Sequence, residues 1–268
     1  MPGVEVDPGR SMSRSERAGA QAASDDQVAA RVAEASAELL MRLRRELGSG
    51  DPRALRDAGD RQSHDLIARL LAELRPEDPV LSEEGDHQGA RSGSSRVWIV
   101  DPLDGTREFG ELDRDDWAVH VALCVDGTPV SAAVALPAQG LTMTSAAPPP
   151  LPQREGQRPR LVVSRTRPPE FVPRIASALD AEVVPMGSAG AKAMAVAQGR
   201  ADAYVHAGGQ YEWDTAAPVG VCLAAALHAS RIDGSPLQYN RDDPWMPDIL
   251  VCRRELAPRL LELLREAL

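Results

Sequence analysis

Two aspartates stand three positions apart at the end of a short apolar run. Val97-Trp98-Ile99-Val100 leads directly into Asp101-Pro102-Leu103-Asp104-Gly105-Thr106. Proline favours an extended conformation in the residue before it, so the pattern predicts a buried strand that carries both carboxylates at its end. Two carboxylates and the Leu103 carbonyl suit a hard cation such as Mg²⁺. A helix starting at Gly105 would add free amides that can bind a phosphate.

Two further acidic segments follow predicted strands or open a predicted helix. Ser82-Glu83-Glu84-Gly85 comes after the apolar pair Val80-Leu81, and Glu212-Trp213-Asp214-Thr215 begins an apolar helix. Taken alone, paired glutamates are typical of a solvated surface, an aspartate at a helix start is typical of a cap, and Asp-Gly-Thr is typical of a capped turn. Three such segments at element ends together predict one metal cluster.

The elements that would position these groups suggest a layered α/β protein. Ser24 and Gln27 have the spacing of a capping box. Helices are predicted from Ser24 to about Gly48, 61–74, 170–179, after Gly187, from Asp214 and 256–264; strands are predicted at 80–81, 97–100, 161–163, 183–184, 203–205 and 249–251, with a hairpin over 117–136. A proline-rich segment, 146–160, is the predicted linker. We therefore expect a flexible lead-in over 1–24 and two halves, 25–150 and 151–268.

Composition and charge argue against some classes of binding partner. The net charge of −10 over 268 residues argues against a nucleic-acid polymer or an anionic membrane as the main partner. It does not argue against a small phosphorylated molecule, because acidic side chains can hold cations that in turn hold the phosphate. No apolar run reaches the ~18 residues of a membrane span. Cys124, Cys222 and Cys252 lie in separate apolar stretches, which predicts free core thiols and a reducing cytoplasm. Lys192 is the only lysine in the chain.

The three acidic segments resemble the metal-binding motifs of a known superfamily. "VWIVDPLDGTREF", "VLSEEG" and "YEWDTAAP" are similar to those of the lithium-sensitive, magnesium-dependent phosphatases. These include inositol monophosphatases, fructose-1,6-bisphosphatases and 3'(2'),5'-bisphosphate nucleotidases, and the resemblance implies a layered αβαβα fold. Arg107-Glu108-Phe109 and "DGSPLQYN" resemble the CysQ-type nucleotidase branch, which removes the 3'-phosphate of 3'-phosphoadenosine 5'-phosphate (PAP).

The resemblance also assigns roles to individual residues. One Mg²⁺ would be held by Glu83, Asp101 and the Leu103 carbonyl, and a second by Asp101, Asp104 and Asp214, with room for a third ion. Asp60, expected just before the second helix, would orient a water together with Thr106 and Glu83. The expected substrate contacts are Gly105, Thr106, Gly187, Ser188, Lys192 and His206. The branch further implies a link to sulfate assimilation, with PAPS as an alternative substrate. The sequence leaves the oligomeric state open, a homodimer included.

Several alternatives stay open at this point. The segment Arg56–Asp60 departs from the family pattern around the water-orienting acid. His206 stands where nucleotidases often have arginine and inositol phosphatases often have glutamate, and it could equally be a strand residue facing solvent. Lys192 could be an ordinary surface lysine. An inositol phosphatase, a fructose bisphosphatase, a broad-specificity enzyme and a catalytically silent phosphate-sensing scaffold are the competing functions; the last is disfavoured because all four acidic ligands are present.

Overall fold

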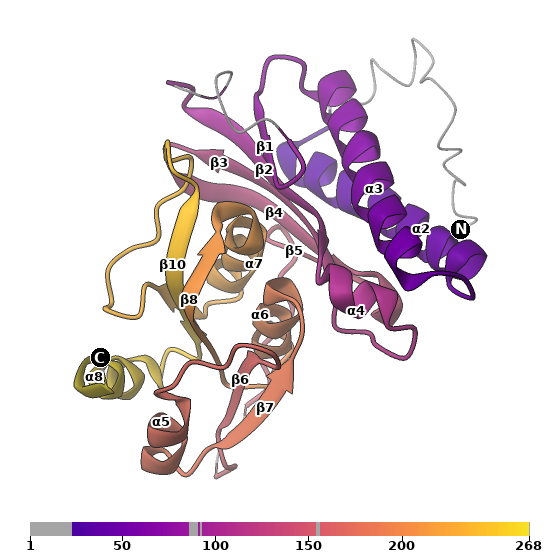
Figure 1. Cartoon of the computed structure of the whole chain (residues 1–268). Coiled ribbons are helices and arrows are strands. Elements are labelled where there is room, and N and C mark those ends of the chain that lie inside the picture. The colour runs from indigo at the N-terminus through magenta and orange to yellow at the C-terminus, as the bar shows by residue number, and fades with distance from the viewer. Residues whose placement is uncertain (1–22, 86–90, 92, 154–155, 268) are drawn as a thin grey trace.

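Two five-stranded sheets organise the described chain, and helices cover their faces (Figure 1). The computed structural model describes residues 23–85, 91, 93–153 and 156–267. The predicted lead-in, 1–24, therefore lies almost wholly outside the described residues. Between the two sheets, the described residues of the predicted linker form no helix or strand until Arg160, its last residue, which begins the second sheet.

The first sheet has the strand order β1-β2-β3-β4-β5. Its strands are β1 (Val80–Ser82), β2 (Arg96–Asp104), β3 (Ala118–Val125), β4 (Thr128–Leu136) and β5 (Leu141–Thr144), with a 3₁₀ turn, η1 (Pro137–Gln139), before the last. β1 runs parallel to β2, and the other neighbours are antiparallel. β3 and β4 form the hairpin that alternating apolar residues predict. The ladder between β2 and β3 shifts register between Asp101 and Asp104, within the acidic motif.

The second sheet has the order β7-β6-β8-β10-β9. Its strands are β6 (Arg160–Ser164), β7 (Glu182–Met186), β8 (Ala203–Tyr211), β9 (His228–Ser230) and β10 (Trp245–Cys252). β6 pairs in parallel with β7 and β8, while β10 is antiparallel to both β8 and β9.

The helices form three layers around the two sheets. They are α2 (Asp25–Leu47), α3 (Pro52–Leu74), α4 (Thr106–Gly110), α5 (Val172–Ala178), α6 (Ala189–Ala197), α7 (Glu212–Ala224) and α8 (Ala257–Ala267). One core joins α2 and α3 to the first sheet, a second joins α6 and α7 to both sheets, and a third joins α5 and α8 to the second sheet. This order of layers confirms the predicted αβαβα fold.

The helix α3 begins nine residues before the predicted start at Arg61. Asp51 caps it by accepting a hydrogen bond of 2.9 Å from the Arg53 amide, and Pro52 takes the first helical position. This cap was missed because the polar stretch after Pro52 hides the helical period. In consequence, the expectation that Asp60 precedes the helix is wrong, since Asp60 lies inside α3.

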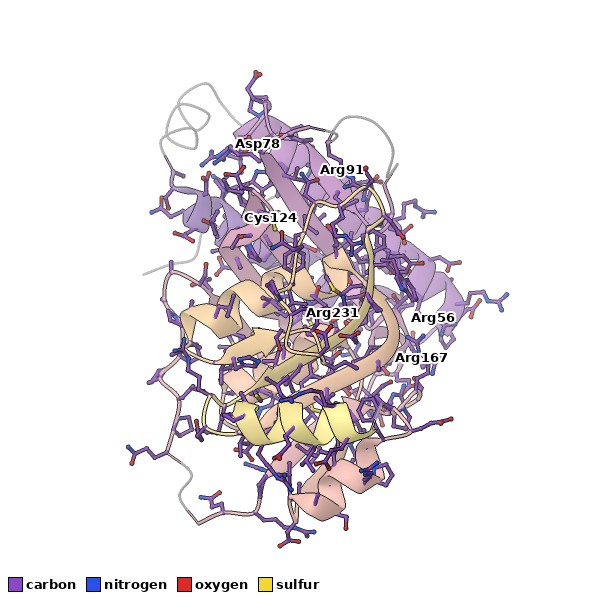
Figure 2. All side chains as sticks on the ribbon, turned by 90° about the vertical axis from the view of Figure 1, so that its left-hand side faces the viewer. Arg56, Asp78, Arg91, Cys124, Arg167 and Arg231 are labelled. Carbon is purple, nitrogen blue, oxygen red and sulfur yellow. The ribbon has the colours of Figure 1, made fainter. Side chains whose placement is uncertain are left out.

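The three cysteines are buried and free, as predicted; Figure 2 labels Cys124 in the first sheet. Burial raises the pKa of the Cys252 thiol to about 12 and that of the other two further. All three are therefore inert core residues. In the described ranges, no helix combines the length and apolar character that crossing a membrane requires.

Gly59 lets α3 approach the acidic motif closely. A Cβ at this position would lie 2.7 Å from Cε1 of Phe109 and 2.9 Å from Cδ2 of Leu103, both of which are fully buried. Ser63, one turn further along, donates a 2.7 Å hydrogen bond to the Pro102 carbonyl. The contact surface of α3 therefore reaches the backbone of the motif itself.

We expect Gly59→Ala to destabilise the protein, although alanine is the better helix former. Overpacking against Phe109 and Leu103 should lower the free energy of unfolding by about 1–3 kcal/mol, measured by urea denaturation. Ala72→Gly, at an exposed position of the same helix, is the control; it should cost only the propensity difference of about 0.5–1 kcal/mol. A stabilised Gly59→Ala variant would contradict this account of the α3 contact.

Candidate active site

Gly105 separates the acidic strand from a short helix. β2 runs through the motif as far as Asp104, and α4 begins at Thr106, one residue later than expected. Gly105 has φ +87°, a conformation that L side chains rarely adopt. A Cβ there would also lie 3.1 Å from Cβ of Ser188. Glycine is thus required both for the turn and for the approach of α6.

Three carboxylates from distant parts of the chain meet at this turn. One oxygen each of Asp101, Asp104 and Asp214 lies within 4.8 Å of the others. Asp101 and Asp104 come from β2, and Asp214 from the first turn of α7. The Asp214 carboxylate is oriented by a 2.6 Å hydrogen bond that it accepts from the Tyr211 amide. The predicted convergence of these three residues is therefore observed.

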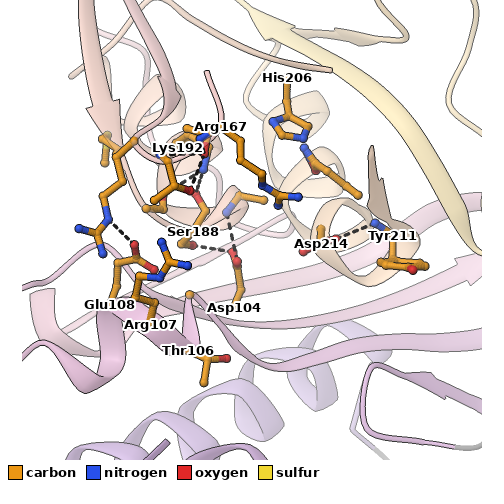
Figure 3. A pocket seen from close by; sticks show the side chains of 18 of the residues that line it. Asp104, Thr106, Arg107, Glu108, Arg167, Ser188, Lys192, His206, Tyr211 and Asp214 are labelled. Carbon is orange, nitrogen blue, oxygen red and sulfur yellow. Dashed lines mark hydrogen bonds and ion pairs between the residues drawn. The ribbon is translucent and has the colours of Figure 1, made fainter. Parts of the chain in front are cut away.

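Asp104 is held by the N-terminus of α6 (Figure 3). It accepts hydrogen bonds from the Ser188 hydroxyl at 2.5 Å, the Ala189 amide at 3.1 Å and the Gly190 amide at 2.6 Å. These donors include the unsatisfied amides of a helix start. Gly187 and Ser188, predicted as substrate contacts, thus lie at the site, with Ser188 bonded to Asp104; their contact with substrate stays a prediction.

His120 is a site residue that the sequence analysis missed. It is fully buried on β3, opposite Asp101 in the ladder, and its Nε2 lies 3.2 Å from Oδ2 of Asp104. Its Nδ1 lies 3.0 Å from the Trp213 carbonyl, just before Asp214. A lone histidine among apolar strand residues was the available signal.

The charges around Asp104 set its protonation state. Burial favours the neutral acid, but His120, Lys192 and the Ser188 hydroxyl outweigh it and lower the pKa of Asp104 to about 2. Burial opposes a charge on His120, yet Asp104 raises the pKa of that imidazole. Asp104 is therefore the carboxylate of the cluster whose charged form the protein itself stabilises most.

A cavity of about 500 Å³ opens beside the cluster. Asp104 and Asp214 line it together with the basic residues Arg107, Arg165, Arg167 and Lys192. In Figure 3 the side chain of Arg167 lies between those of Asp104 and Asp214. Arg165 is paired with Glu108 at 2.5 Å and Glu111 at 2.7 Å. The arrangement provides oxygen ligands and cationic groups around one space, which suits a phosphorylated small molecule.

Comparison with known proteins assigns the chain to a family. The profile of the inositol monophosphatase family matches residues 18–268. The chain belongs to the inositol monophosphatase family. Among its curated relatives, a 3'-phosphoadenosine 5'-phosphate phosphatase of Mycobacterium bovis is 53% identical over 241 residues, covering 86% of this chain and 89% of the relative. The 3'(2'),5'-bisphosphate nucleotidase CysQ of Escherichia coli is 35% identical, covering 70% and 81%.

Solved structures of family members share the fold. CysQ from Bacteroides thetaiotaomicron superimposes with a TM-score of 0.71 at 26% identity, covering 86% of this chain and 97% of that one. Inositol monophosphatase II of Staphylococcus aureus gives 0.75 at 22% identity, covering 90% and 94%. Together with the layered cores, these similarities establish the αβαβα architecture.

The family is metal-dependent, and the acidic cluster fits a cation. Burial and the neighbouring carboxylates of Glu83, Asp104 and Asp214 raise the pKa of Asp101. Burial and Asp104 likewise raise the pKa of Asp214 to about 6. Buried carboxylates repel one another when little positive charge lies nearby. A divalent cation that prefers oxygen ligands would bind to them and stabilise their charged forms.

Glu83 and the Leu103 carbonyl lie around this cluster without belonging to the group of three. Glu83 follows β1 in an exposed turn, yet burial of its carboxylate and the charge of Asp214 raise its pKa to about 8. The Leu103 carbonyl accepts a 3.1 Å hydrogen bond from the Thr106 hydroxyl. Their places in the metal site stay predictions.

Asp60 contacts the motif from within α3. Its Oδ1 lies 3.1 Å from the Thr106 hydroxyl, so the structure brings together the two residues that were predicted to act as a pair. Burial, together with Glu84 and Asp57, raises the pKa of Asp60 to about 6 despite the hydrogen bond from Thr106.

Lys192 and His206 are both buried. The alternatives that Lys192 is an ordinary surface lysine and that His206 is a strand residue facing solvent are therefore wrong. The Nζ of Lys192, 5% exposed, donates to the carbonyls of Gly187 at 3.1 Å and Ser188 at 2.5 Å. His206, 4% exposed, has Nε2 3.1 Å from the Gly209 carbonyl. Burial lowers the pKa of His206 to about 4 and that of Lys192 to about 8. Both residues line the cavity.

We expect His120→Leu to destabilise the protein strongly. The change removes the imidazole beside buried Asp104 and the partner of the Trp213 carbonyl. The free energy of unfolding should fall by about 2–4 kcal/mol, measured by urea denaturation at pH 7. His228→Leu is the control, because that half-buried histidine, among the described residues, hydrogen-bonds Ser230 alone, at 2.9 Å. Equal, small losses in the two variants would show that His120 does not support Asp104.

Proposed function

We propose that the chain hydrolyses the 3'-phosphate of 3'-phosphoadenosine 5'-phosphate to give AMP and phosphate. The single observation that carries the proposal is the 53% identity, over 86% of the chain, to a relative named for this activity. The site supports it chemically. One cavity presents a carboxylate cluster for a metal-bound phosphate and separate cationic groups for a second phosphate.

The proposed metal ligands are Asp101, Asp104, Asp214, Glu83 and the Leu103 carbonyl. Two or three Mg²⁺ ions bound there would act as Lewis acids and offset the charge of the phosphate. The protein's own residues hold these ligands in place. The α6 N-terminus and His120 orient Asp104, and the Tyr211 amide orients Asp214.

Thr106 and Asp60 are the proposed water-orienting pair. Hydrolysis requires a water in line with the bond from phosphorus to the leaving 3'-oxygen. The Thr106 hydroxyl lines the cavity and contacts the Asp60 carboxylate at 3.1 Å. Such a pair can accept hydrogen bonds from a water and take up its proton as the new bond to phosphorus forms. Glu83, which lines the same cavity, is the second candidate for this orienting function.

Arg167 is the proposed contact for the 5'-phosphate. Its guanidinium points into the cavity (Figure 3) and, within the described part of the chain, is paired with no carboxylate. Lys192, in contrast, already bonds two carbonyls at the start of α6. A guanidinium recognises phosphate through parallel hydrogen bonds, so Arg167 suits a second phosphate that inositol 1-phosphate lacks.

The metal proposal has a direct test in Asp101→Asn. Losing a metal ligand should lower kcat on PAP at least about 100-fold, and it should reduce the rise in Tm that Mg²⁺ gives the unaltered protein. EDTA should abolish activity, and lithium should lower it. Asp126→Asn, in the β3–β4 turn, is the control and should behave like the unaltered protein. Full activity in EDTA, or an unchanged Mg²⁺ response in Asp101→Asn, would refute the metal site.

Arg167 and Lys192 should differ in how they affect two substrates. Arg167→Met should lower kcat/KM for PAP by about 10- to 100-fold, the value of a hydrogen bond between charged groups, and should affect inositol 1-phosphate little. Lys192→Met should lower both, because Lys192 supports the α6 start that holds Asp104. Arg174→Met, on α5 outside the cavity, is the control. Equal losses on both substrates in Arg167→Met would remove Arg167 as the 5'-phosphate contact.

A further inference from the structure

An exposed aromatic pair lies on the wall of the same cavity. Tyr211 and Trp245 are 41% and 40% exposed, the only aromatic residues among the exposed large hydrophobics of the described chain. Both line the cavity together with Asp214 and Arg167. The metal and phosphate contacts proposed above make no use of either ring.

The two rings are held in place by their surroundings. Tyr211 stacks on Trp213 with centroids 4.7 Å apart, and it meets Trp245 edge-to-face at 5.4 Å. Trp245 lies directly over the backbone of Gly209, where a Cβ would come within 1.8 Å of its Cη2 atom. Gly209 also has φ +97°, which L side chains rarely adopt. Both its backbone conformation and its contact with Trp245 therefore favour glycine. These contacts constrain the positions of both rings.

The pair is joined to the metal-binding cluster by short connections. Tyr211 and Trp245 are directly opposite in the β8–β10 ladder. The Tyr211 amide is the group that bonds the Asp214 carboxylate at 2.6 Å. A ligand with a phosphate at the carboxylates can therefore extend along the cavity toward the aromatic rings, which line it together with Asp214.

We infer that Tyr211 and Trp245 form a stacking platform for the purine base of the substrate. This inference rests on the proposed function and adds the part of the substrate that neither phosphate contact recognises. A flat aromatic face binds any base by stacking, and each stacked base contributes a measurable share of affinity. The order along the cavity is then phosphate at the carboxylates, ribose beside Asp214, and base on Trp245.

Binding of AMP to two Trp245 variants tests the platform without catalysis. Calorimetric titration in metal-free buffer should give a Kd that rises about 5- to 100-fold in Trp245→Leu, which removes the ring. Trp245→Phe keeps an aromatic ring, and its Kd for AMP should stay within about threefold of that of the unaltered protein. Leu223→Ala removes another exposed apolar side chain, 42% exposed on α7 and outside this cavity, and should not change Kd. An unchanged Kd in Trp245→Leu would overturn the inference.

Kinetics separate the platform from the proposed function. In Trp245→Leu, KM for PAP should rise in parallel with the Kd for AMP while kcat changes little, and inositol 1-phosphate, which has no base, should be hydrolysed nearly as before. Equal losses on both substrates would make Trp245 a structural residue and overturn the inference. If the unaltered protein preferred inositol 1-phosphate, the proposed function would fail, whereas the AMP titration would still decide whether the rings bind a base.

Discussion

Three carboxylates that repel one another are held within 4.8 Å in the interior, and much of the fold serves to keep them there. Two of them sit on a single strand whose ladder shifts register between them. The third arrives on a helix from the other end of the chain. Like charges repel strongly in the low dielectric of a protein interior. Without a rigid fold around them, the three carboxylates would therefore move apart. The buried backbone of β2 and the packed helices α6 and α7 oppose that repulsion.

The protein compensates only one of these charges fully. Asp104 receives a hydroxyl, two helix amides and an imidazole, and its pKa is low. Asp101 and Asp214 accept few hydrogen bonds, and their pKa values are raised. The contrast divides the cluster into one carboxylate whose charge the protein stabilises and two whose charged forms a bound cation would stabilise. A metal site built in this way is ordered before the metal binds, which lowers the reorganisation that binding requires.

The sequence predicted the parts of this site that depend on local patterns. The strand before Asp101, the turn at Gly105 and the helix opened by Asp214 all follow from short-range rules of periodicity and turn formation. The start of α3 was missed because Asp51-Pro52 was not interpreted as a helix cap. As a result, Asp60 was predicted to precede the helix and not to lie within it. The burial of Lys192 and His206 depends on how distant elements pack over them. His120 needed the register between β2 and β3, which single-sequence patterns do not give.

The anchoring of Asp104 by α6 has a consequence for biosynthesis. Ser188 lies 84 residues after Asp104 in the chain. At ~5–20 residues per second, a ribosome needs about 4–17 s to add the helix that receives this carboxylate. During that interval the nascent first sheet carries an uncompensated acidic strand end and lacks the α6–α7 layer that covers its inner face. Because burial of an unpaired carboxylate is costly, we expect Asp101 and Asp104 to stay hydrated until α6 and α7 have been made.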